Sequence, residues 1–435
     1  MSEIKFDVNQ CVEFPSSITV HDYADKIILL APLVPNWVVL NKEEYNLYLE
    51  LNKGQSIIES LHEIHDKFEY SETRCINVIT SLLSKVEKSK FYASNYGENE
   101  PKIDSFKKNI HLEITSDCNI RCKHCYMSAG KKNATYIDKV DIDKFFNEID
   151  LDRVDENIVV TGGEPLIHPE INEIISGLNS KGFKVCLFTN GLMINHSNID
   201  FLKNNINSIQ LSMEGVSQNA YEDIRGKNTY TRLINAIKLI KDNNIRLILA
   251  ITILDDNLSD VEKNIQSFLS DLSYDNMEVR INDELEKKGN ATNLTSNNFD
   301  LIKVNKPRVR ELIKNLEIQG FYYSTNDNKC KRFSNCGIGA SIVINSAGDI
   351  YPCNDYNQPT KYNIRNTEKI SHMINQFDAI NIETSTSNIP TCNKCDIKYL
   401  CAGGCRTKNL RLNGSMTSVM CNRKNIIENL ILSEI

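Results

Sequence analysis

The chain has 435 residues, which leaves room for about three domains. Its 41% hydrophobic and 25% charged residues are typical of a soluble globular protein, and no apolar run is long enough to span a bilayer. The net charge of −7 gives no reason to expect nucleic acid as a partner.

The first ten residues, MSEIKFDVNQ, contain neither the basic region nor the apolar region of a signal peptide. We therefore expect a cytoplasmic protein that does not bind a membrane. Thiols stay reduced in that compartment, so the 14 cysteines are expected to act as metal ligands before they form disulfides.

Residues 1–95 predict a small module that contains no cluster of metal ligands. Strands are predicted at 25–32 and 36–41, and helices at 42–51, 53–68 and 72–89. The stretch that follows, 96–108, is polar with glycine and proline and predicts a linker.

The sequence WVVLNKEEYNLYLELNKGQSIIE (37–59) resembles the winged-helix-like recognition element at the front of maturases for ribosomally made peptides. The resemblance implies that this module binds the leader of a precursor peptide by adding it as a strand to an exposed sheet edge. A plain docking or dimerisation module is the alternative. Winged helices also bind DNA, but this module lacks a basic stripe.

Residues 109–281 alternate between apolar strands and helices, a pattern that predicts a parallel α/β sheet. Six such units make a partial, TIM-like (β/α)6 barrel, with its chemistry at the C-terminal ends of the strands. The strands are predicted within 110–115, 156–165, 183–191, 206–215, 245–253 and 276–282, and the helices within 141–149, 171–179, 232–244 and 260–272.

The loop after the first of these strands reads CNIRCKHCY (118–126) and holds three cysteines. A closed structural zinc site takes four protein ligands, and a disulfide framework takes an even number of cysteines. Three thiolates therefore leave one position to a distant residue or to a group that is not protein. They could hold three irons of a [4Fe–4S] cluster and leave the fourth iron free for a ligand.

Residues at the ends of the later strands describe that ligand. Gly162 and Gly163 let the backbone come close to it. Glu164 offers a carboxylate to an amino group, and Arg225 could clamp a carboxylate with two prongs. An amino group together with a carboxylate describes an amino acid.

The CxxxCxxC spacing, the following aromatic residue and GGEP one βα unit later resemble the radical S-adenosylmethionine (SAM) superfamily. The resemblance implies a cluster on Cys118, Cys122 and Cys125, whose free iron binds the methionine end of SAM. It also implies that cleavage of SAM yields a 5′-deoxyadenosyl radical. The implied SAM contacts are Tyr126 near the adenine, Gly162, Gly163 and Glu164 at the methionine end, Ser212 and Glu214 at the ribose, and Asn190 and Arg225. A zinc-binding fragment is the alternative.

Residues 282–329 are polar and rich in asparagine, with one predicted helix near 307–317, and bridge the barrel to the last quarter of the chain. That last quarter, 330–435, holds eight cysteines, enough for two complete four-thiolate sites. Their spacing, with Gly348 inside a predicted hairpin at 341–353, resembles the SPASM domain with two auxiliary [4Fe–4S] clusters.

The SPASM resemblance implies an interleaved set of ligands. The first auxiliary cluster takes Cys330, Cys336, Cys353 and Cys405, and the second takes Cys392, Cys395, Cys401 and Cys421. Metal binding would then be coupled to local folding, because residues far apart in the chain share one cluster. Two zinc ribbons are the alternative.

The three domains in this order resemble thioether synthases of the sactipeptide and ranthipeptide type. The resemblance implies an oxidoreductase with three [4Fe–4S] clusters that joins a cysteine sulfur of a precursor peptide to a carbon of the same peptide. It also implies an electron donor such as flavodoxin or ferredoxin. No residue is assigned as a catalytic base.

Other activities remain open. Enzymes with the same domains also form C–C crosslinks, oxidise a serine or cysteine to formylglycine, or remove groups from a peptide terminus. The formylglycine group has Asp directly after the third cysteine of the first auxiliary cluster, whereas this chain has Asn354, which cannot accept a proton there. An iron–sulfur carrier without enzymatic activity would not need the amino-acid site that GGEP indicates.

Overall fold

The computed structural model describes residues 7–33, 35–93, 107–130, 133–283, 285–286, 288–294, 301–302, 306–321, 332–356, 358–366 and 369–432. The chain divides into two compact units. The terminal unit comprises 1–104, 325–338 and 380–435, and the central unit comprises 105–324 and 339–379. The C-terminal cysteine-rich segment thus contributes residues to both units. Most of the predicted linker, 96–106, lies outside the described residues.

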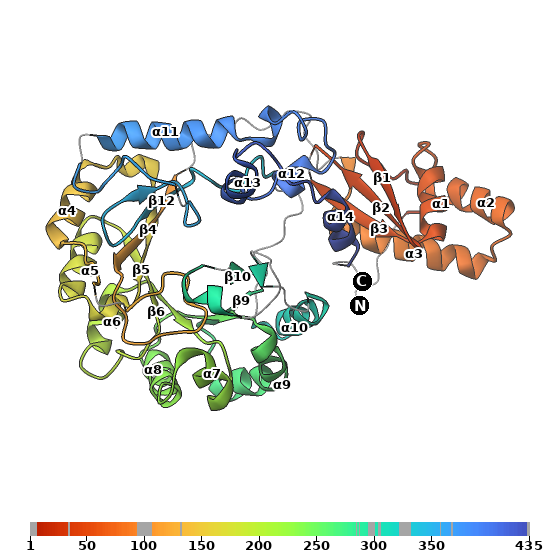
Figure 1. Cartoon of the computed structure of the whole chain (residues 1–435). Helices are drawn as coiled ribbons and strands as arrows, with labels where there is room; N and C mark the ends of the chain where they lie inside the picture. Colours follow the sequence, from red (N-terminus) through yellow and green to blue (C-terminus); the bar gives the residue numbers. More distant parts are fainter. Residues whose placement is uncertain are drawn as a thin grey trace. The chain divides into compact units, whose positions relative to one another are not determined.

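A curved, mostly parallel sheet forms the centre of the central unit (Figure 1). Among the described residues its strand order is β13-β12-β4-β5-β6-β7-β8-β9. The six strands predicted from sequence are present and parallel: β4 (Lys108–Thr115), β5 (Val154–Gly162), β6 (Lys184–Thr189), β7 (Ser208–Ser212), β8 (Leu247–Thr252) and β9 (Met277–Asn282). This confirms the α/β class with a mostly parallel sheet.

Buried and partly exposed residues alternate along β4 and show which face of the sheet the helices cover. Ile110, Leu112 and Ile114 are fully buried, whereas His111 and Glu113 on the other face are partly exposed. Helices lie on the outer side of the sheet in Figure 1, so the apolar row of β4 faces them. The polar row therefore faces the inner side.

The helices of the central unit include all of those predicted. They are α4 (Lys139–Glu148), α5 (Ile171–Ser180), α6 (Ile199–Asn205), α7 (Gln218–Arg225), α8 (Tyr230–Asp242), α9 (Asp255–Leu272) and α10 (Lys306–Ile318). Helix α9 begins five residues before its predicted start. The Asn257 side chain accepts a hydrogen bond from Leu254 N at 2.7 Å and so caps the earlier start. Helices α6 and α7, of 7 and 8 residues, are too short for their periodicity to stand out in the sequence.

The predicted hairpin is present as β12 (Ser341–Ile344) and β13 (Ile350–Tyr351), and β12 also pairs in parallel with β4. The buried Lys108 at the start of β4 supports this junction. Its Nζ donates to the Gly339 carbonyl at 2.7 Å and forms an ion pair with Asp378. Short strands β10 (Leu285–Glu286) and β11 (Leu301–Ile302) form a separate ladder.

In the described part of the terminal unit, an antiparallel sheet has the order β1-β2-β3. Its strands are β1 (Thr19–Tyr23), β2 (Lys26–Ala31) and β3 (Asn36–Leu40), followed by helices α1 (Lys42–Leu51), α2 (Ile57–Phe68) and α3 (Glu72–Ser89). Capping boxes at Asn41 and Ser56 start α1 and α2. The three predicted helices are confirmed, and β1 is a strand that the sequence analysis did not predict.

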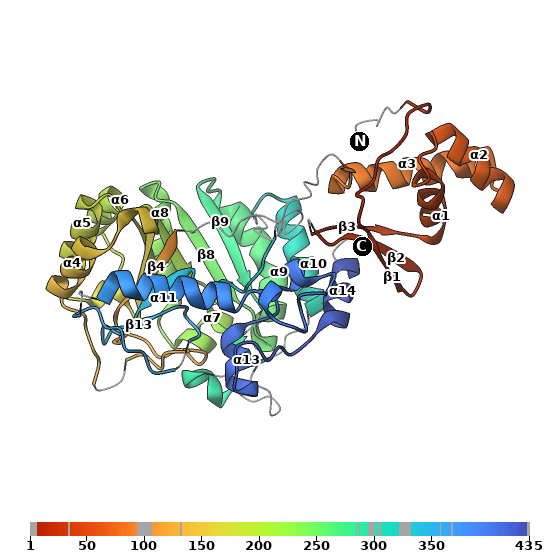
Figure 2. The ribbon, with the colours of Figure 1, turned by 90° about the horizontal axis from the view of Figure 1, so that it is seen from above.

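Both faces of this sheet are covered. Helices α1, α2 and α3 pack on one face, where Leu29 and Val38 are buried (Figure 2). The opposite face, with Ile28 and Trp37, packs against apolar side chains near the C-terminus: Ile397, Ile427 and Ile431. These belong to or adjoin α12 (Lys398–Cys401) and α14 (Arg423–Leu432), so the first and last parts of the chain share one core. Two further α-helices of the described residues are α11 (Ile370–Glu383), which spans the boundary between the units, and α13 (Arg406–Asn413).

None of the helices in the part of the chain that the structure describes is both long and apolar enough to cross a membrane.

Candidate functional site

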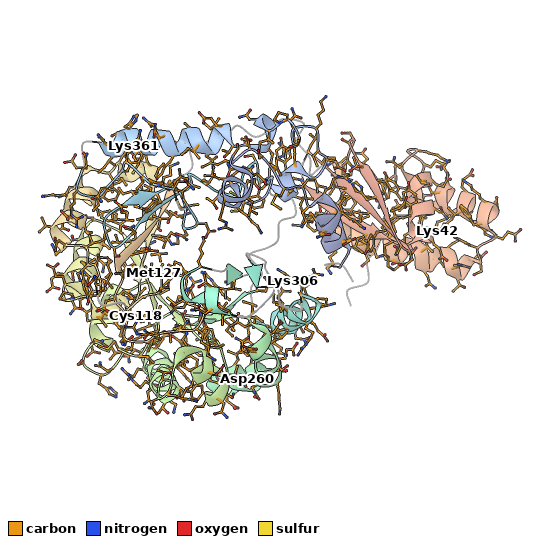
Figure 3. All side chains as sticks on the ribbon, viewed as in Figure 1. Lys42, Cys118, Met127, Asp260, Lys306 and Lys361 are labelled. Atoms are coloured by element: carbon orange, nitrogen blue, oxygen red, sulfur yellow. The ribbon has the colours of Figure 1, made fainter. Side chains whose placement is uncertain are left out.

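The three-cysteine loop follows β4, and Figure 3 labels Cys118 and Met127 on it. Cys122 is buried, and the other two cysteines are partly exposed. Ala129 N donates to Cys125 Sγ at 3.4 Å, and Asn190 Nδ2 lies 3.9 Å from Cys118 Sγ. Burial raises the pKa of Cys118 to about 11, so a thiolate there requires a cationic partner such as a metal.

A [4Fe–4S] cluster and a single metal ion place their thiolate ligands differently. In the described residues, no three His, Cys, Asp or Glu side chains converge as they would around one metal ion. A [4Fe–4S] cluster spreads three thiolates over three different irons, so its ligands do not converge on one point. The assignment of Cys118, Cys122 and Cys125 as cluster ligands stays a prediction.

The glycines of the GGEP motif seat one backbone segment against another. A Cβ on Gly162, whose φ is +141°, would lie 2.3 Å from Thr115 O, and a Cβ on Gly163 would lie 2.0 Å from Asp117 O. Gly163 N donates to Thr115 O at 2.7 Å, and Glu164 N donates to Asp117 O at 2.8 Å. The turn is thereby fixed to the start of the cysteine loop.

Changing Gly163 to alanine should cost about 1–3 kcal/mol of unfolding free energy, because the added methyl overlaps backbone that cannot move aside. Urea denaturation measures the loss. Gly177→Ala is the matched control, since Gly177 lies inside α5 and its Cβ would lie 3.2 Å from the nearest atom, Asp143 Oδ1. Equal stability of the two variants would contradict the packing role of Gly163.

Glu164 is fully buried and joins the ends of β5 and β6. Its carboxylate accepts hydrogen bonds from Thr189 Oγ1 at 2.6 Å, Asn190 N at 2.8 Å and Leu166 N at 3.0 Å. Burial raises the pKa of this carboxyl, and the three donors oppose that rise. Because a carboxylate has about four acceptor positions, about one remains for the amino group predicted from sequence.

Asn190 connects the end of β6 to the cysteine loop. Its Nδ2 donates to Asn119 Oδ1 at 2.8 Å, and its Oδ1 accepts from Leu192 N at 3.0 Å. The structure therefore brings Glu164 and Asn190 together beside Cys118, as expected for residues at the ends of neighbouring parallel strands. Asn119 and Thr189 complete this network, and the sequence analysis did not single them out.

Glu214 and Arg225 pair with each other. Arg225 Nη2 lies 2.7 Å from Glu214 Oε1, its Nε contacts Oε2, and His124 Nε2 lies 3.4 Å from Oε1. Burial raises the pKa of Glu214, but Arg225 and His124 outweigh that effect and lower the pKa to about 2. The sequence predicts that Arg225 binds a ligand carboxylate through two hydrogen bonds. In the structure Nε and Nη2 of Arg225 both donate to Glu214 instead. Arg225 also lies beside the Cys122 thiol.

Two of the predicted SAM contacts, Ser212 and Tyr126, are not fully buried. Ser212 is the last residue of β7 and is partly exposed. Tyr126 is exposed, and its hydroxyl donates to Glu113 Oε1 at 3.1 Å. Glu113 belongs to the inner row of β4, which the sequence analysis did not mark as functional.

A turn in the predicted bridging region also holds the cysteine loop. Asn290 N donates to Cys125 O at 2.8 Å, and Asn290 Nδ2 donates to Cys122 O at 3.0 Å. A Cβ on Gly289 would lie 2.4 Å from the carbonyl oxygens of Cys125 and Tyr126. A Gly-Asn pair in a polar stretch is too common a signal for this contact to be found from sequence.

In the terminal unit, Cys336 and Cys405 lie close together, and their interaction lowers the pKa of Cys405 and raises that of Cys336. Both were predicted for the first auxiliary cluster. Cys353 belongs to the central unit, and Cys330 lies outside the described residues. That ligand set stays a prediction.

Three of the four cysteines predicted for the second auxiliary cluster are neighbours. Cys395 N donates to Cys392 O at 2.9 Å. Burial raises the pKa of Cys401, and the charges of Cys392 and Cys395 raise it further. The fourth, Cys421, is exposed. The three thiols lie near one another, and their assignment to one cluster stays a prediction.

Residues 112–268 match the Radical SAM superfamily. The antilisterial bacteriocin subtilosin biosynthesis protein AlbA of Bacillus subtilis is 25% identical over 336 residues, which are 72% of this chain and 71% of AlbA. The sporulation killing factor maturation protein SkfB of the same organism is 28% identical over 157 residues, 36% of this chain and 38% of SkfB.

A similar fold is found in SuiB of Streptococcus suis, whose crystal structure was determined bound to the precursor peptide SuiA. The match has a TM-score of 0.57 and 14% identity, and it covers 94% of this chain and 99% of SuiB. At that identity the likeness concerns the fold alone.

Proposed function

We propose, from the premise that this chain is an enzyme of the radical SAM superfamily with its radical SAM domain at residues 112–268, that it is a cytoplasmic peptide maturase. It installs thioether bonds between a cysteine sulfur and a carbon of one ribosomally made precursor. The observation that carries the proposal is the assembly of the cysteine loop, the GGE turn and Asn190 at the ends of neighbouring parallel strands. The similarity to AlbA over 72% of the chain supports the substrate class.

Different residues of the central unit would bind the cluster and the separate parts of SAM. Cys118, Cys122 and Cys125 would hold the cluster, which supplies the electron that cleaves SAM into the radical that takes hydrogen from the peptide. Gly162, Gly163, Glu164 and Asn190 would hold the methionine end, and Tyr126 would lie near the adenine. Ser212 and Glu214 would contact the ribose. Arg225 places a buried positive charge beside Cys122 and so offsets the negative charge of the thiolates.

The inner row of the sheet would receive the peptide. His111, Glu113 and Gln210 alternate with buried apolar residues along their strands and present polar groups on the face away from the helices. A peptide backbone requires such partners, because its amide groups lose water on binding. Tyr126 joins this surface through its hydrogen bond to Glu113.

Two auxiliary [4Fe–4S] clusters would bind to the C-terminal cysteines, and the electron left on the product would leave through one of them. An electron donor such as flavodoxin or ferredoxin would supply the electron for the cleavage of SAM. The first auxiliary cluster would use Cys330, Cys336, Cys353 and Cys405, and the second would use Cys392, Cys395, Cys401 and Cys421. The contact between Cys336 and Cys405 and the proximity of Cys392, Cys395 and Cys401 support this division. Asp355, which adjoins the formylglycine base position, is paired with Lys288 at 3.1 Å, which does not favour that activity.

The module at residues 1–95 would bind the leader of the precursor. Both faces of its sheet are covered by packed helices and apolar side chains, so strand addition at an edge is the mode of binding that remains. Edge strand β1 carries exposed Val20 and Tyr23, which a bound leader strand could contact. The precursor peptide in the SuiB structure supports a peptide partner for this fold.

Thiol counting tests the proposed bond. Each thioether removes two hydrogens, so we expect a loss of about 2 Da per bond and one fewer alkylated cysteine after full reduction. A C–C crosslink has the same mass loss but leaves every cysteine free. Mass spectrometry of iodoacetamide-treated product measures both quantities, and full alkylation of a product that has lost mass would exclude the thioether. A precursor without its leader should be modified poorly, and equal modification would assign residues 1–95 to docking or dimerisation.

A further inference from the structure

Arg406 is a fully buried cation among the C-terminal cysteines. It directly follows Cys405 at the start of α13, and its side chain has no exposed surface. Its backbone N donates to Cys336 Sγ at 3.4 Å. Negative charge on Cys336, Cys392, Cys401 or Cys405 would favour the charged guanidinium, so cysteines predicted for both auxiliary clusters act on one cation.

The guanidinium is held by backbone carbonyls. Nε donates to Thr384 O at 2.8 Å, Nη1 to Gly403 O at 2.6 Å and Gly404 O at 2.8 Å, and Nη2 to Ala402 O at 2.7 Å. Ala402, Gly403 and Gly404 have φ values of +51°, +70° and +71°, a run of left-handed conformations that glycine adopts readily and alanine rarely. A Cβ on Gly403 would lie 2.8 Å from the guanidinium nitrogens.

The backbone carbonyls accept hydrogen bonds from the Arg406 guanidinium, but they do not neutralise its positive charge. Carbonyl groups are dipoles without net charge, and among the described residues Arg406 forms an ion pair with neither Asp nor Glu. Burying an unpaired charge is costly, and an arginine does not release its proton to avoid that cost. The partners at hand that can carry negative charge are the four cysteines.

We propose that Arg406 supplies the positive counter-charge of the auxiliary iron–sulfur centre, by which we mean the two clusters proposed on the C-terminal cysteines. Four thiolates around a [4Fe–4S] core leave a net negative charge, and reduction adds one more. A buried positive charge beside the thiolates stabilises the reduced form over the oxidised form and so raises the reduction potential. This inference rests on the proposed function and adds a residue that favours the transfer of an electron from the peptide to that centre.

The test compares Arg406→Lys with Arg406→Met in a background that lacks Cys118, Cys122 and Cys125, so that the remaining iron is auxiliary. Each protein is reconstituted anaerobically with iron and sulfide, and its iron content and EPR-monitored midpoint potential are measured. Arg406→Met should lower the potential or lose the cluster, whereas Arg406→Lys should keep the cluster with a potential near that of the background protein. Lys408→Met removes a partly exposed cation of the same helix and should leave the potential unchanged.

The possible results distinguish failure of the proposed auxiliary clusters from failure of the counter-charge role of Arg406. If the background protein binds no iron, the proposed auxiliary clusters are wrong. If it binds iron and both Arg406 variants keep the same potential, the counter-charge role is wrong while the clusters stand. Loss of iron in both variants would assign Arg406 to holding the 402–404 backbone, since lysine keeps the charge but not the four carbonyl contacts.

Discussion

Replacing Cys118, Cys122 and Cys125 together by alanine should remove about four irons per chain and abolish the release of 5′-deoxyadenosine from SAM. The three thiols occupy one loop held by the GGE turn and by Asn290, so other residues cannot readily take their place. Iron and sulfide analysis after anaerobic reconstitution measures the first effect. Chromatography of a reaction with SAM and a reductant measures the second.

Cys186→Ala is the control for the triple variant. Cys186 lies on β6, is partly buried and is not among the predicted ligands, so this variant should keep its iron and its SAM cleavage. SAM cleavage retained by the triple variant would exclude Cys118, Cys122 and Cys125 as the catalytic ligands. Loss of only part of the iron is expected, because the C-terminal cysteines are unchanged.

Replacing Arg225 by alanine should destabilise the central unit by about 3–5 kcal/mol, the usual cost of leaving one partner of a buried ion pair without the other. Glu214 and Arg225 are 1% and 8% exposed, so water cannot take the place of the guanidinium. Urea denaturation measures the loss. Arg246→Ala is the control, because Arg246 is largely exposed and its pair with Glu278 should contribute less than about 1 kcal/mol. Equal effects of the two substitutions would contradict the assignment.

The same pair predicts a dependence on pH. The pKa of Glu214 is lowered from 4.5 to about 2 in the folded protein, so its ionised form is favoured by folding. The resulting stabilisation, roughly 3 kcal/mol, is fully present above pH 4.5 and is lost as the pH falls towards 2. The difference in stability between the native protein and Arg225→Ala should therefore shrink on acidification over that interval. A difference that stays constant would show that Glu214 does not titrate as the buried pair requires.

Local patterns in the sequence were sufficient for most of the elements. Six strands and the longer helices have strong periodicity, and all are present. The cysteine spacing and GGEP pointed to the radical SAM domain, because both act within a few residues of the chain or at the ends of adjacent parallel strands. Strand β1 was missed because its side chains are mostly exposed and lack the apolar run of a buried strand.

The partners of individual side chains were decided by the tertiary structure. The sequence by itself determined the class of sheet, the cysteine loop and the turn that supports it, since short-range spacing and strand order place those groups together. It did not determine that Arg225 meets Glu214, that Arg406 lies among four cysteines, or that residues near the C-terminus pack on the N-terminal sheet. Alternation of apolar residues specifies which face of an element is buried but not what covers it. That choice depends on the packing of segments distant in the chain.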